Sequence, residues 1–551
     1  MPTVEHSKPR GLRQERRQKR GDVGTPFALI QIVLALGLVM TELLLYGGVR
    51  PEIAMAFAGL YALLAMSLQI APVERRRKQG PDVLLTFAGV LFLALLGWTA
   101  LTLTPLVKTW IAPEWRDVAA QGAITVDRWT TSLEIVKLAC LACLFVIGRD
   151  LAMTPVAARR AHALVGAAAA GFALWAIVAF RQSPDLLFGF DKPYHTGRLT
   201  ASFLSANTAG AVFGGFAALA FAAVLDNIDS ARGGSMQRRL IVATLWFVVF
   251  TLCAAALLFS ASRVATLATA LVVAALTIHK LWRVFLGRGR LAAWIAVGVV
   301  AALVLGGVVA RQSLANSPLA ARLDVVALDL APRAQIIDLT MAEAKSRIWQ
   351  GHGLGTFREA MNPVIGGPRY GVLSDINAAH NIVAQWLLDG GAVGTVLMFA
   401  TVAVVLAVLV RRGGSRRPGA GRAIGVLAFS FVLIGHNQFD YSLQVPGVAA
   451  LWALLLGLGL GPPPARARSK ARAAARPADS QASEPVSEDE RQTSRSEDVA
   501  AMLGGSAARP QGFATPSAVW DEPSTRLSAK WPAGSRTAAN RSSRRAGSKR
   551  W

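Results

Sequence analysis

A histidine and two arginines at the ends of apolar stretches, and a third arginine in a polar segment, are the side chains of this sequence best suited to do chemistry. His380, in Ala379-His380-Asn381, stands where an apolar stretch begins, and an imidazole at a water-accessible helix entrance can act as a general base near neutral pH. Arg198 and Arg263 also lie at the mouths of apolar stretches. Guanidinium groups and exposed helix N–H groups both favour anions, so these arginines can help to hold a phosphate.

Simpler interpretations of the same residues remain open. Arg198 lies in Gly197-Arg-Leu-Thr-Ala-Ser-Phe203, where Thr200 or Ser202 is able to cap the helix that follows. Arg263 ends the tight turn Ser260-Ala-Ser-Arg263. In this interpretation, both arginines only anchor the chain to lipid headgroups. His380 has only a packing or capping role.

The third arginine, Arg333, precedes an amphipathic run that ends in Gly351-His-Gly-Leu-Gly-Thr-Phe357. The glycines allow positive φ or close backbone approach, but no strand precedes them and the Gly-Lys-Ser/Thr ending of a phosphate loop is missing. After Asn381 comes Asp389-Gly-Gly391, which predicts a kink, because glycines loosen a membrane helix locally.

The elements that carry these residues follow from the composition. The chain has 551 residues, 53% hydrophobic and 17% charged, with a formal net charge of +25. Such a charge is typical of nucleic-acid binders, but uncharged stretches of about 20 residues recur throughout, and this length crosses the hydrocarbon of a bilayer. The chain is therefore predicted to be an all-α polytopic membrane protein without a nucleic-acid partner. Its three cysteines lie in apolar stretches and indicate neither a disulfide framework nor a metal site.

About twelve spans are predicted, the shortest being 264–278 and 423–436. The twelve are 26–48, 52–72, 83–104, 131–148, 163–180, 204–225, 240–260, 264–278, 291–310, 381–410, 423–436 and 445–461. With the N-terminus inside, five short inner loops of 60 residues hold 19 Lys or Arg, whereas five short outer loops of 63 residues hold eight. Positive residues stay on the cytoplasmic side, so both termini are predicted to be cytoplasmic. The first span is interpreted as a retained signal anchor.

Outside the spans, three segments are long enough to matter. The basic tails 1–24 and 462–551 bury little apolar surface, which predicts disorder, and their Lys and Arg runs can contact anionic membrane lipids. The region between them, 25–461, is the predicted membrane domain, with one long outer loop at 311–380. Few spans contain charged groups, and Glu134 and Lys137 are explained by a mutual ion pair. The polar residues gather at the outer ends of spans, which indicates work at the outer membrane surface.

The order of these short motifs resembles the O-antigen ligase / O-antigen polymerase superfamily. The likeness rests on Arg-Leu-Thr-x-x-Phe with a following Asn, Ser-x-Ser-Arg before a span, Gly-His-Gly-Leu-Gly-Thr-Phe in a long outer loop, and Ala-His-Asn entering a helix. It covers roughly residues 185–460. Two positions depart from the pattern, because Asp389 stands where a Glu is common and Ala201 where a Gly is common.

The resemblance implies an inner-membrane glycosyltransferase of the C-type architecture that works on the periplasmic side. Its donor would be a glycan linked to undecaprenyl diphosphate, and it would need no nucleotide sugar, metal or other cofactor. By matching motif, His380 would deprotonate an acceptor hydroxyl, which attacks the anomeric carbon with inversion. Arg198 and Arg263 would hold the diphosphate, with Arg333 and Asn381 in support.

The sequence leaves the acceptor open. A ligase would use lipid A-core and a polymerase a growing polysaccharide, and both share the donor motifs. A non-catalytic transporter of lipid-linked glycans predicts polar groups within the spans, and the sparse charge there argues against it. A structural subunit of an envelope assembly is the third alternative.

Overall fold

A computed structural model describes residues 29–70, 82–115, 122–228, 235–282, 326–365, 376–415 and 419–461. The chain divides into two units, Met1–Ala475 and Arg476–Trp551, and every described residue lies in the first. The tail segments 1–24 and 462–551 and the predicted span 291–310 lie outside the described residues.

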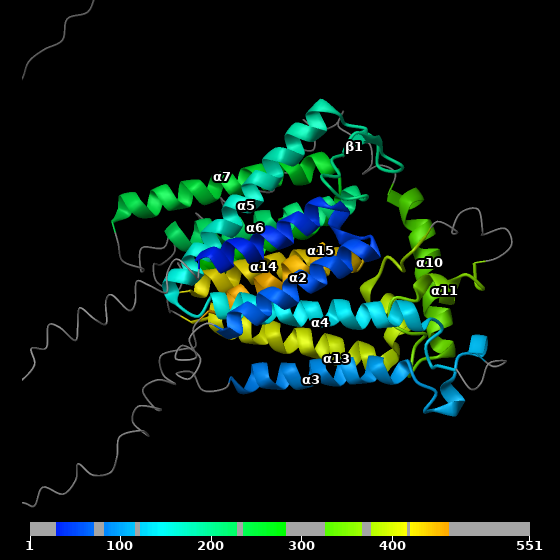
Figure 1. Cartoon of the computed structure of the whole chain (residues 1–551). Coiled ribbons are helices and arrows are strands. Elements are labelled where there is room, and N and C mark those ends of the chain that lie inside the picture. The colour runs from blue at the N-terminus through cyan, green and yellow to red at the C-terminus, as the bar shows by residue number, and fades with distance from the viewer. Residues whose placement is uncertain are drawn as a thin grey trace, which may run out of the picture. The chain divides into compact units, whose positions relative to one another are not determined.

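The described residues form an assembly of long apolar helices (Figure 1). Eight of them are long and apolar enough to cross a membrane, and three further apolar helices are shorter. The long ones are α2 (Pro51–Ile70), α3 (Val83–Thr102), α4 (Arg128–Leu151), α5 (Pro155–Gln182), α6 (Ala206–Ile228), α7 (Met236–Ser260), Arg263–Trp282 and α13 (Ile382–Gly413). The shorter ones are Leu29–Leu44, α14 (Ala420–His436) and α15 (Pro446–Leu460). The prediction of an all-α polytopic membrane protein is confirmed. The number twelve stays a prediction.

Short elements join the helices. A two-stranded antiparallel hairpin pairs β1 (Leu186–Leu187) with β2 (Phe190–Asp191). Three 3₁₀ turns follow the helix Leu29–Leu44, α3 and α14: η1 (Tyr46–Gly48), η3 (Lys108–Trp110) and η7 (Ser442–Gln444).

Helix α6 is the central helix of the bundle. Of its most apolar window, 89% is buried, against a third or less for the other long spans. Its sequence is rich in Ala and Gly, and small residues let helix backbones approach closely. A Cβ at Gly210 would press on Ser260 and Ser262, and one at Gly215 on Phe429. The turn that leads to Arg263 therefore packs directly on α6.

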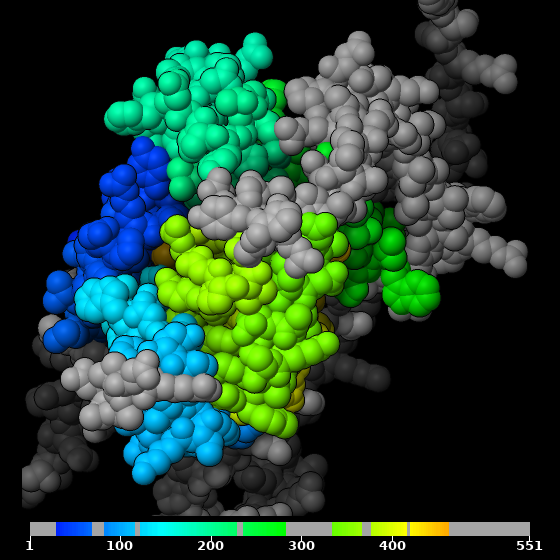
Figure 2. Space-filling model, turned by 90° about the vertical axis from the view of Figure 1, so that its right-hand side faces the viewer, coloured from blue at the N-terminus to red at the C-terminus, as the bar shows by residue number. Residues whose placement is uncertain are grey.

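The predicted loop 311–380 contains two helices in its described part. They are α10 (Val326–Ser346) and α11 (Phe357–Met361), and α10 packs against α13. The predicted amphipathic run lies on α10, where Ile336, Thr340 and Ala344 are buried at helical spacing. Figure 2 shows this face, with α10 and α11 in yellow-green across its centre. We call this end of the helices the α10 end.

The predicted kink in α13 is confirmed at Gly391, whose φ is +63° and whose ψ is −175°. A break in a membrane helix frees backbone groups that need new partners. The glycine-rich run supplies them, because His352 N–H donates to Leu388 O at 2.8 Å and Gly353 N–H to Asp389 O at 2.9 Å. Gly353 has a φ of +109°, and a Cβ there would overlap Thr125. These glycines thus serve close backbone packing, as their spacing indicated.

Candidate functional site

Five segments meet at the α10 end around one buried carboxylate, Asp440. They are the Arg198 segment, the turn after α7, α10, the His380 segment, and the chain between α14 and α15. We call the group of side chains that they bring together the Asp440 cluster: Arg198, Asn207, Arg333, His380, Asp440 and Tyr441.

Asp440 is held by groups from three elements. One of its oxygens, Oδ2, accepts a hydrogen bond from Asn207 Nδ2 at 2.8 Å and lies 3.8 Å from Arg333 Nη2. The other, Oδ1, accepts from the Tyr441 N–H at 2.8 Å. The residue is 1% exposed. Burial raises the pKa of this carboxyl, but the nearby His436, His380 and Arg333 outweigh burial and hold the pKa below its usual range. Asp440 is therefore a fixed negative charge.

Arg198 is buried against the turn that follows α7. Its Nε donates to Ser260 O at 2.9 Å, and its Nη2 donates to Ala261 O at 3.2 Å and to Asn207 Oδ1 at 3.1 Å. The guanidinium thus connects two predicted motifs through backbone carbonyls. Through Asn207 it is also linked to Asp440. Because these acceptors are neutral, they leave the positive charge of Arg198 in the cluster unbalanced by their own charge.

Residues that flank the β1–β2 hairpin form hydrogen bonds to the Arg198 segment. Lys192 Nζ donates to Pro184 O at 2.6 Å and to Arg198 O at 2.9 Å, and Asp185 accepts from the Gly197 N–H at 2.7 Å. Burial lowers the pKa of Lys192, with Asp185 opposing the shift. These contacts hold the Arg198 backbone in one position.

Arg263 is the first residue of the helix Arg263–Trp282 and is partly exposed. It follows Ser260, Ala261 and Ser262, whose carbonyls and close contact with α6 fix the turn. Because Arg198 binds that same turn, its guanidinium lies next to the segment that leads to Arg263. Arg263 is not joined to Asp440 by the contacts described above.

His380 lies beside the carboxylate with strained backbone geometry. Its φ is +53°, which is uncommon for a residue other than Gly or Asn, and such strain occurs often at functional sites. Its ring meets the edge of Tyr441 at a centroid distance of 5.0 Å, and its Nδ1 is buried without a hydrogen-bond partner among the described residues. Burial lowers its pKa, as does Arg333, whereas Asp440 raises it. The lowered pKa favours the neutral imidazole, which is the form that can accept a proton.

Asn381 and Arg333 hold neighbouring backbone in place. The Asn381 Oδ1 caps α13 by accepting from the N–H groups of Val383 and Ala384, both at 2.9 Å, and its Nδ2 donates to Gln438 O at 3.0 Å. Arg333 Nη1 donates to Phe439 O at 2.9 Å. The two predicted supporting residues therefore hold the chain directly after His380 and directly before Asp440.

One local prediction was wrong. Neither Thr200 nor Ser202 caps the helix after the Arg198 motif, because α6 begins later, at Ala206, and Ser205 Oγ accepts from the Asn207 N–H at 3.2 Å. Ser202 instead donates to Leu43 O at 2.6 Å. Ser205 caps the helix because a capping residue must directly precede the first turn.

Asp440 and Glu42 were missed by the sequence reasoning. Asp440 stands in Asn437-Gln-Phe-Asp-Tyr441, a polar run without Lys or Arg between two apolar segments, and this run was the available signal. Glu42 is 2% exposed within the first apolar segment, where it accepts a hydrogen bond from Tyr61 at 2.5 Å. The predicted ion pair between Glu134 and Lys137 is confirmed at 2.5 Å.

Ala201 has a φ of +51°, a region that favours glycine. We expect Ala201→Gly to raise the free energy of unfolding by about 1 kcal/mol, because the Cβ strain is removed. Thermal unfolding of the purified protein in detergent measures this. The control is Ala209→Gly within α6, which should lower stability. An equal loss of stability in both variants would contradict the strain at Ala201.

The comparisons with known proteins address this same part of the chain. Residues 246–399 match the family model described as O-antigen ligase. This match confirms the resemblance to the O-antigen ligase/polymerase superfamily for this segment of the chain. No curated protein matches it. The matched segment includes Arg263, Arg333 and His380, whereas Arg198 and Asp440 lie outside it.

The match agrees with the helical architecture and supports a coarse function. The long apolar helices indicate a multi-pass membrane protein, and the matched family supports an O-antigen ligase or polymerase type of function on lipid-linked glycan and polysaccharide substrates.

Proposed function

We propose that the protein is an inner-membrane glycosyltransferase that moves a glycan from an undecaprenyl diphosphate carrier to an acceptor hydroxyl on the periplasmic side. The observation that carries the proposal is the Asp440 cluster. A neutral histidine with a lowered pKa lies beside a fixed carboxylate at the same end of the bundle as the guanidinium groups of Arg198, Arg263 and Arg333. A general base and an anion site together are what group transfer from a lipid diphosphate needs.

In the proposed reaction, His380 takes the proton of the acceptor hydroxyl. The oxygen forms a bond to the anomeric carbon from the side opposite the diphosphate, so the configuration inverts. The bond between the anomeric carbon and the diphosphate oxygen breaks, and its electron pair leaves with the diphosphate. Asp440 stabilises the imidazolium that forms, because its negative charge raises the pKa of His380.

In this reaction the arginines supply positive charge for the diphosphate. Arg263, at a helix start and partly exposed, is positioned to bind diphosphate oxygens directly. Arg198 keeps the Arg263 turn in place through Ser260 O and Ala261 O and adds its charge. Preorganised charge aimed at a leaving group contributes several kcal/mol without a metal ion.

The cellular test is deletion of the gene followed by examination of the polysaccharides. We propose a ligase, for which long undecaprenyl-linked chains should accumulate without transfer to lipid A-core. Single repeat units that are never extended would indicate a polymerase instead. Unchanged polysaccharides in the deletion strain would contradict both.

Arg263→Lys should impair transfer in the complemented deletion strain by about tenfold or more. A compact ammonium cannot reproduce the two parallel hydrogen bonds of a guanidinium to phosphate oxygens. The readout is the amount of product polysaccharide per amount of membrane-inserted protein. The control is Arg239→Lys, near the start of α7 at the opposite end of that helix, which should transfer normally. If the Arg263→Lys variant transfers as well as the unchanged protein, the role of this residue is reduced to simple charge.

A further inference from the structure

A cavity of about 570 Å³ lies among α2, α4, α13 and α15, apart from the Asp440 cluster. No residue of that cluster lines it, but Asn377, Ile382 and Gln438 do. The cavity therefore begins beside the His380 segment and continues between the helices. Its volume is within the range of about 300–1,000 Å³ that is typical of small-molecule sites.

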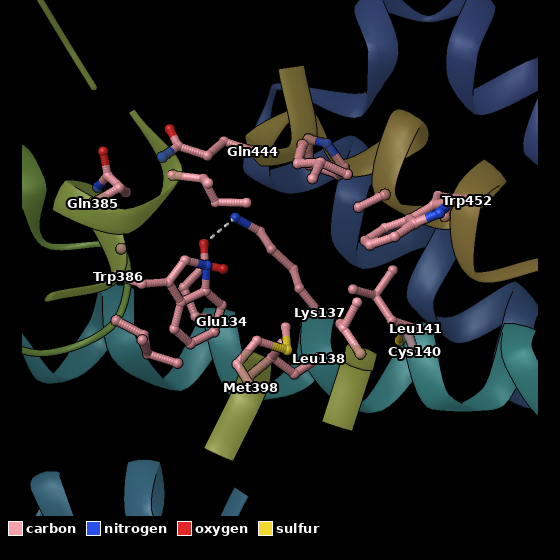
Figure 3. A pocket seen from close by; sticks show the side chains of 18 of the residues that line it. Glu134, Lys137, Leu138, Cys140, Leu141, Gln385, Trp386, Met398, Gln444 and Trp452 are labelled. Carbon is pink, nitrogen blue, oxygen red and sulfur yellow. Dashed lines mark hydrogen bonds and ion pairs between the residues drawn. The ribbon is translucent and has the colours of Figure 1, made fainter. Parts of the chain in front are cut away.

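The part of the cavity farther from the α10 end has apolar walls. Leu141 and Leu144 of α4 line it, as do Met398 and Leu406 of α13. Trp452 of α15 completes this side, and Figure 3 shows it across from Leu141 and Cys140. Walls of this kind remove a hydrocarbon chain from water but offer nothing to a charged group.

The part nearer the α10 end is lined by polar side chains. Gln385 and Trp386 come from α13, Glu134 and Lys137 from α4, and Gln444 from the chain before α15 (Figure 3). Asp389 also lines this part and is 7% exposed. Its Oδ2 accepts hydrogen bonds from Gln385 Nε2 at 2.9 Å and from the Gly355 N–H at 3.3 Å.

The other oxygen of Asp389, Oδ1, is buried and has no hydrogen-bond partner in the described residues. A buried acceptor without a donor is costly, so a ligand hydroxyl that donates to it would be bound favourably. This orphaned acceptor points to a hydroxyl-bearing ligand.

The carboxyl groups of the cavity disfavour a phosphate. Three carboxyl groups line it, those of Glu42, Glu134 and Asp389, against one amine, Lys137, which lies 2.5 Å from Glu134. An excess of carboxyl groups in a poorly solvated space repels phosphate oxygens. Arg198, Arg263 and Arg333 do not line the cavity. The diphosphate and the ligand of this cavity therefore need different sites.

One side chain connects the two sites. Gln385 Oε1 accepts from the Ala379 N–H at 2.8 Å, directly before His380, while its Nε2 binds Asp389. Gln438, another wall residue, offers its carbonyl to Asn381. A ligand whose hydroxyls reach Gln385 and Asp389 thus lies next to the segment that carries His380.

We propose that this cavity is the acceptor site and that it takes an amphiphile with a hydrocarbon chain and an uncharged, hydroxyl-rich head. The chain lies along Leu141, Leu144 and Met398, and the head donates to Asp389. The assignment as acceptor site rests on the proposed function, whereas the binding chemistry does not.

The test uses the full-length protein in nanodiscs with an alkyl β-glucoside that carries a photoreactive diazirine in its chain. Mass spectrometry then maps the adducts. Labelling of the α4 and α13 peptides that line the cavity should saturate, and excess dodecyl maltoside should reduce it by about tenfold. The same concentration of dodecylphosphocholine should displace little of the probe, because its head carries a phosphate.

A matched pair of variants on α13 locates the site. Ala403 lines the cavity, and Ala403→Phe should fill it and lower labelling about tenfold. Val396 is 65% exposed and does not line it, so Val396→Phe should label like the unchanged protein. Labelling that does not saturate, that is unaffected by Ala403→Phe, or that the phosphocholine displaces equally well would overturn the proposal.

The His380→Ala variant separates this proposal from the proposed function. It should keep saturable labelling while losing glycan transfer. Continued transfer with normal labelling would remove the proposed function and the acceptor assignment but leave the binding site. If His380→Ala loses transfer as expected but shows no saturable labelling, the cavity proposal is contradicted and the proposed function is not.

Discussion

His380→Ala is expected to reduce glycan transfer by about 10²–10⁴-fold, the usual contribution of a general base. The imidazole is held by the strained backbone at φ +53°, beside Asp440 and against Tyr441, and alanine offers no group that takes a proton. The measurement is the polysaccharide product in the complemented deletion strain, normalised to membrane-inserted protein.

The matched control is His279→Ala. His279 lies near the far end of the helix Arg263–Trp282, away from the Asp440 cluster, so its replacement should leave transfer unchanged. Retained transfer in His380→Ala at normal protein level would remove the general-base role. Lost transfer in both variants would show that the assay reports folding rather than chemistry.

Asp440→Asn and Arg333→Gln are expected to move the pH profile of transfer in opposite directions. Asp440 raises the pKa of His380 and Arg333 lowers it. Without the carboxylate, the pKa of His380 should fall, so the acid limb of the profile shifts to lower pH. Without the guanidinium, the imidazole should stay protonated to higher pH, so the acid limb shifts upward.

The two variants also differ in rate. Asp440→Asn should lower the maximal rate by about 10²-fold or more, because the imidazolium loses its stabilising charge and the link to Asn207 is weakened. Arg333→Gln removes a more exposed side chain and should cost less. Initial rates of the purified protein between about pH 5 and pH 9 measure both effects. Acid limbs that do not move, or that move together, would contradict the electrostatic coupling in the cluster.

The all-α polytopic fold could be predicted because the length of an apolar stretch is a local signal. The kink at Gly391 and the role of the glycines near His352 also followed from the sequence, since positive φ and close packing restrict a position to glycine. The helix in the loop, α10, was visible only as an amphipathic run, because its partner face on α13 lies far along the chain.

The candidate site could be predicted only in part. His380 and the arginines stand out by type and position, but Asp440 acts through Arg333 and through Asn207, which lies 233 positions away in the chain. No local pattern shows such long-range pairs. The wrong capping prediction at Thr200 has a local cause. Several neighbouring hydroxyls can cap, and the residue at which the helix starts decides which one does.

The most direct test is transfer by the purified protein in nanodiscs, given an undecaprenyl-diphosphate-linked glycan and an acceptor. We predict that each glycan transferred releases one undecaprenyl diphosphate and that nuclear magnetic resonance shows an inverted anomeric configuration in the product. A donor that crosses the membrane with its glycan still attached, or a product with retained configuration, would contradict the proposed transfer.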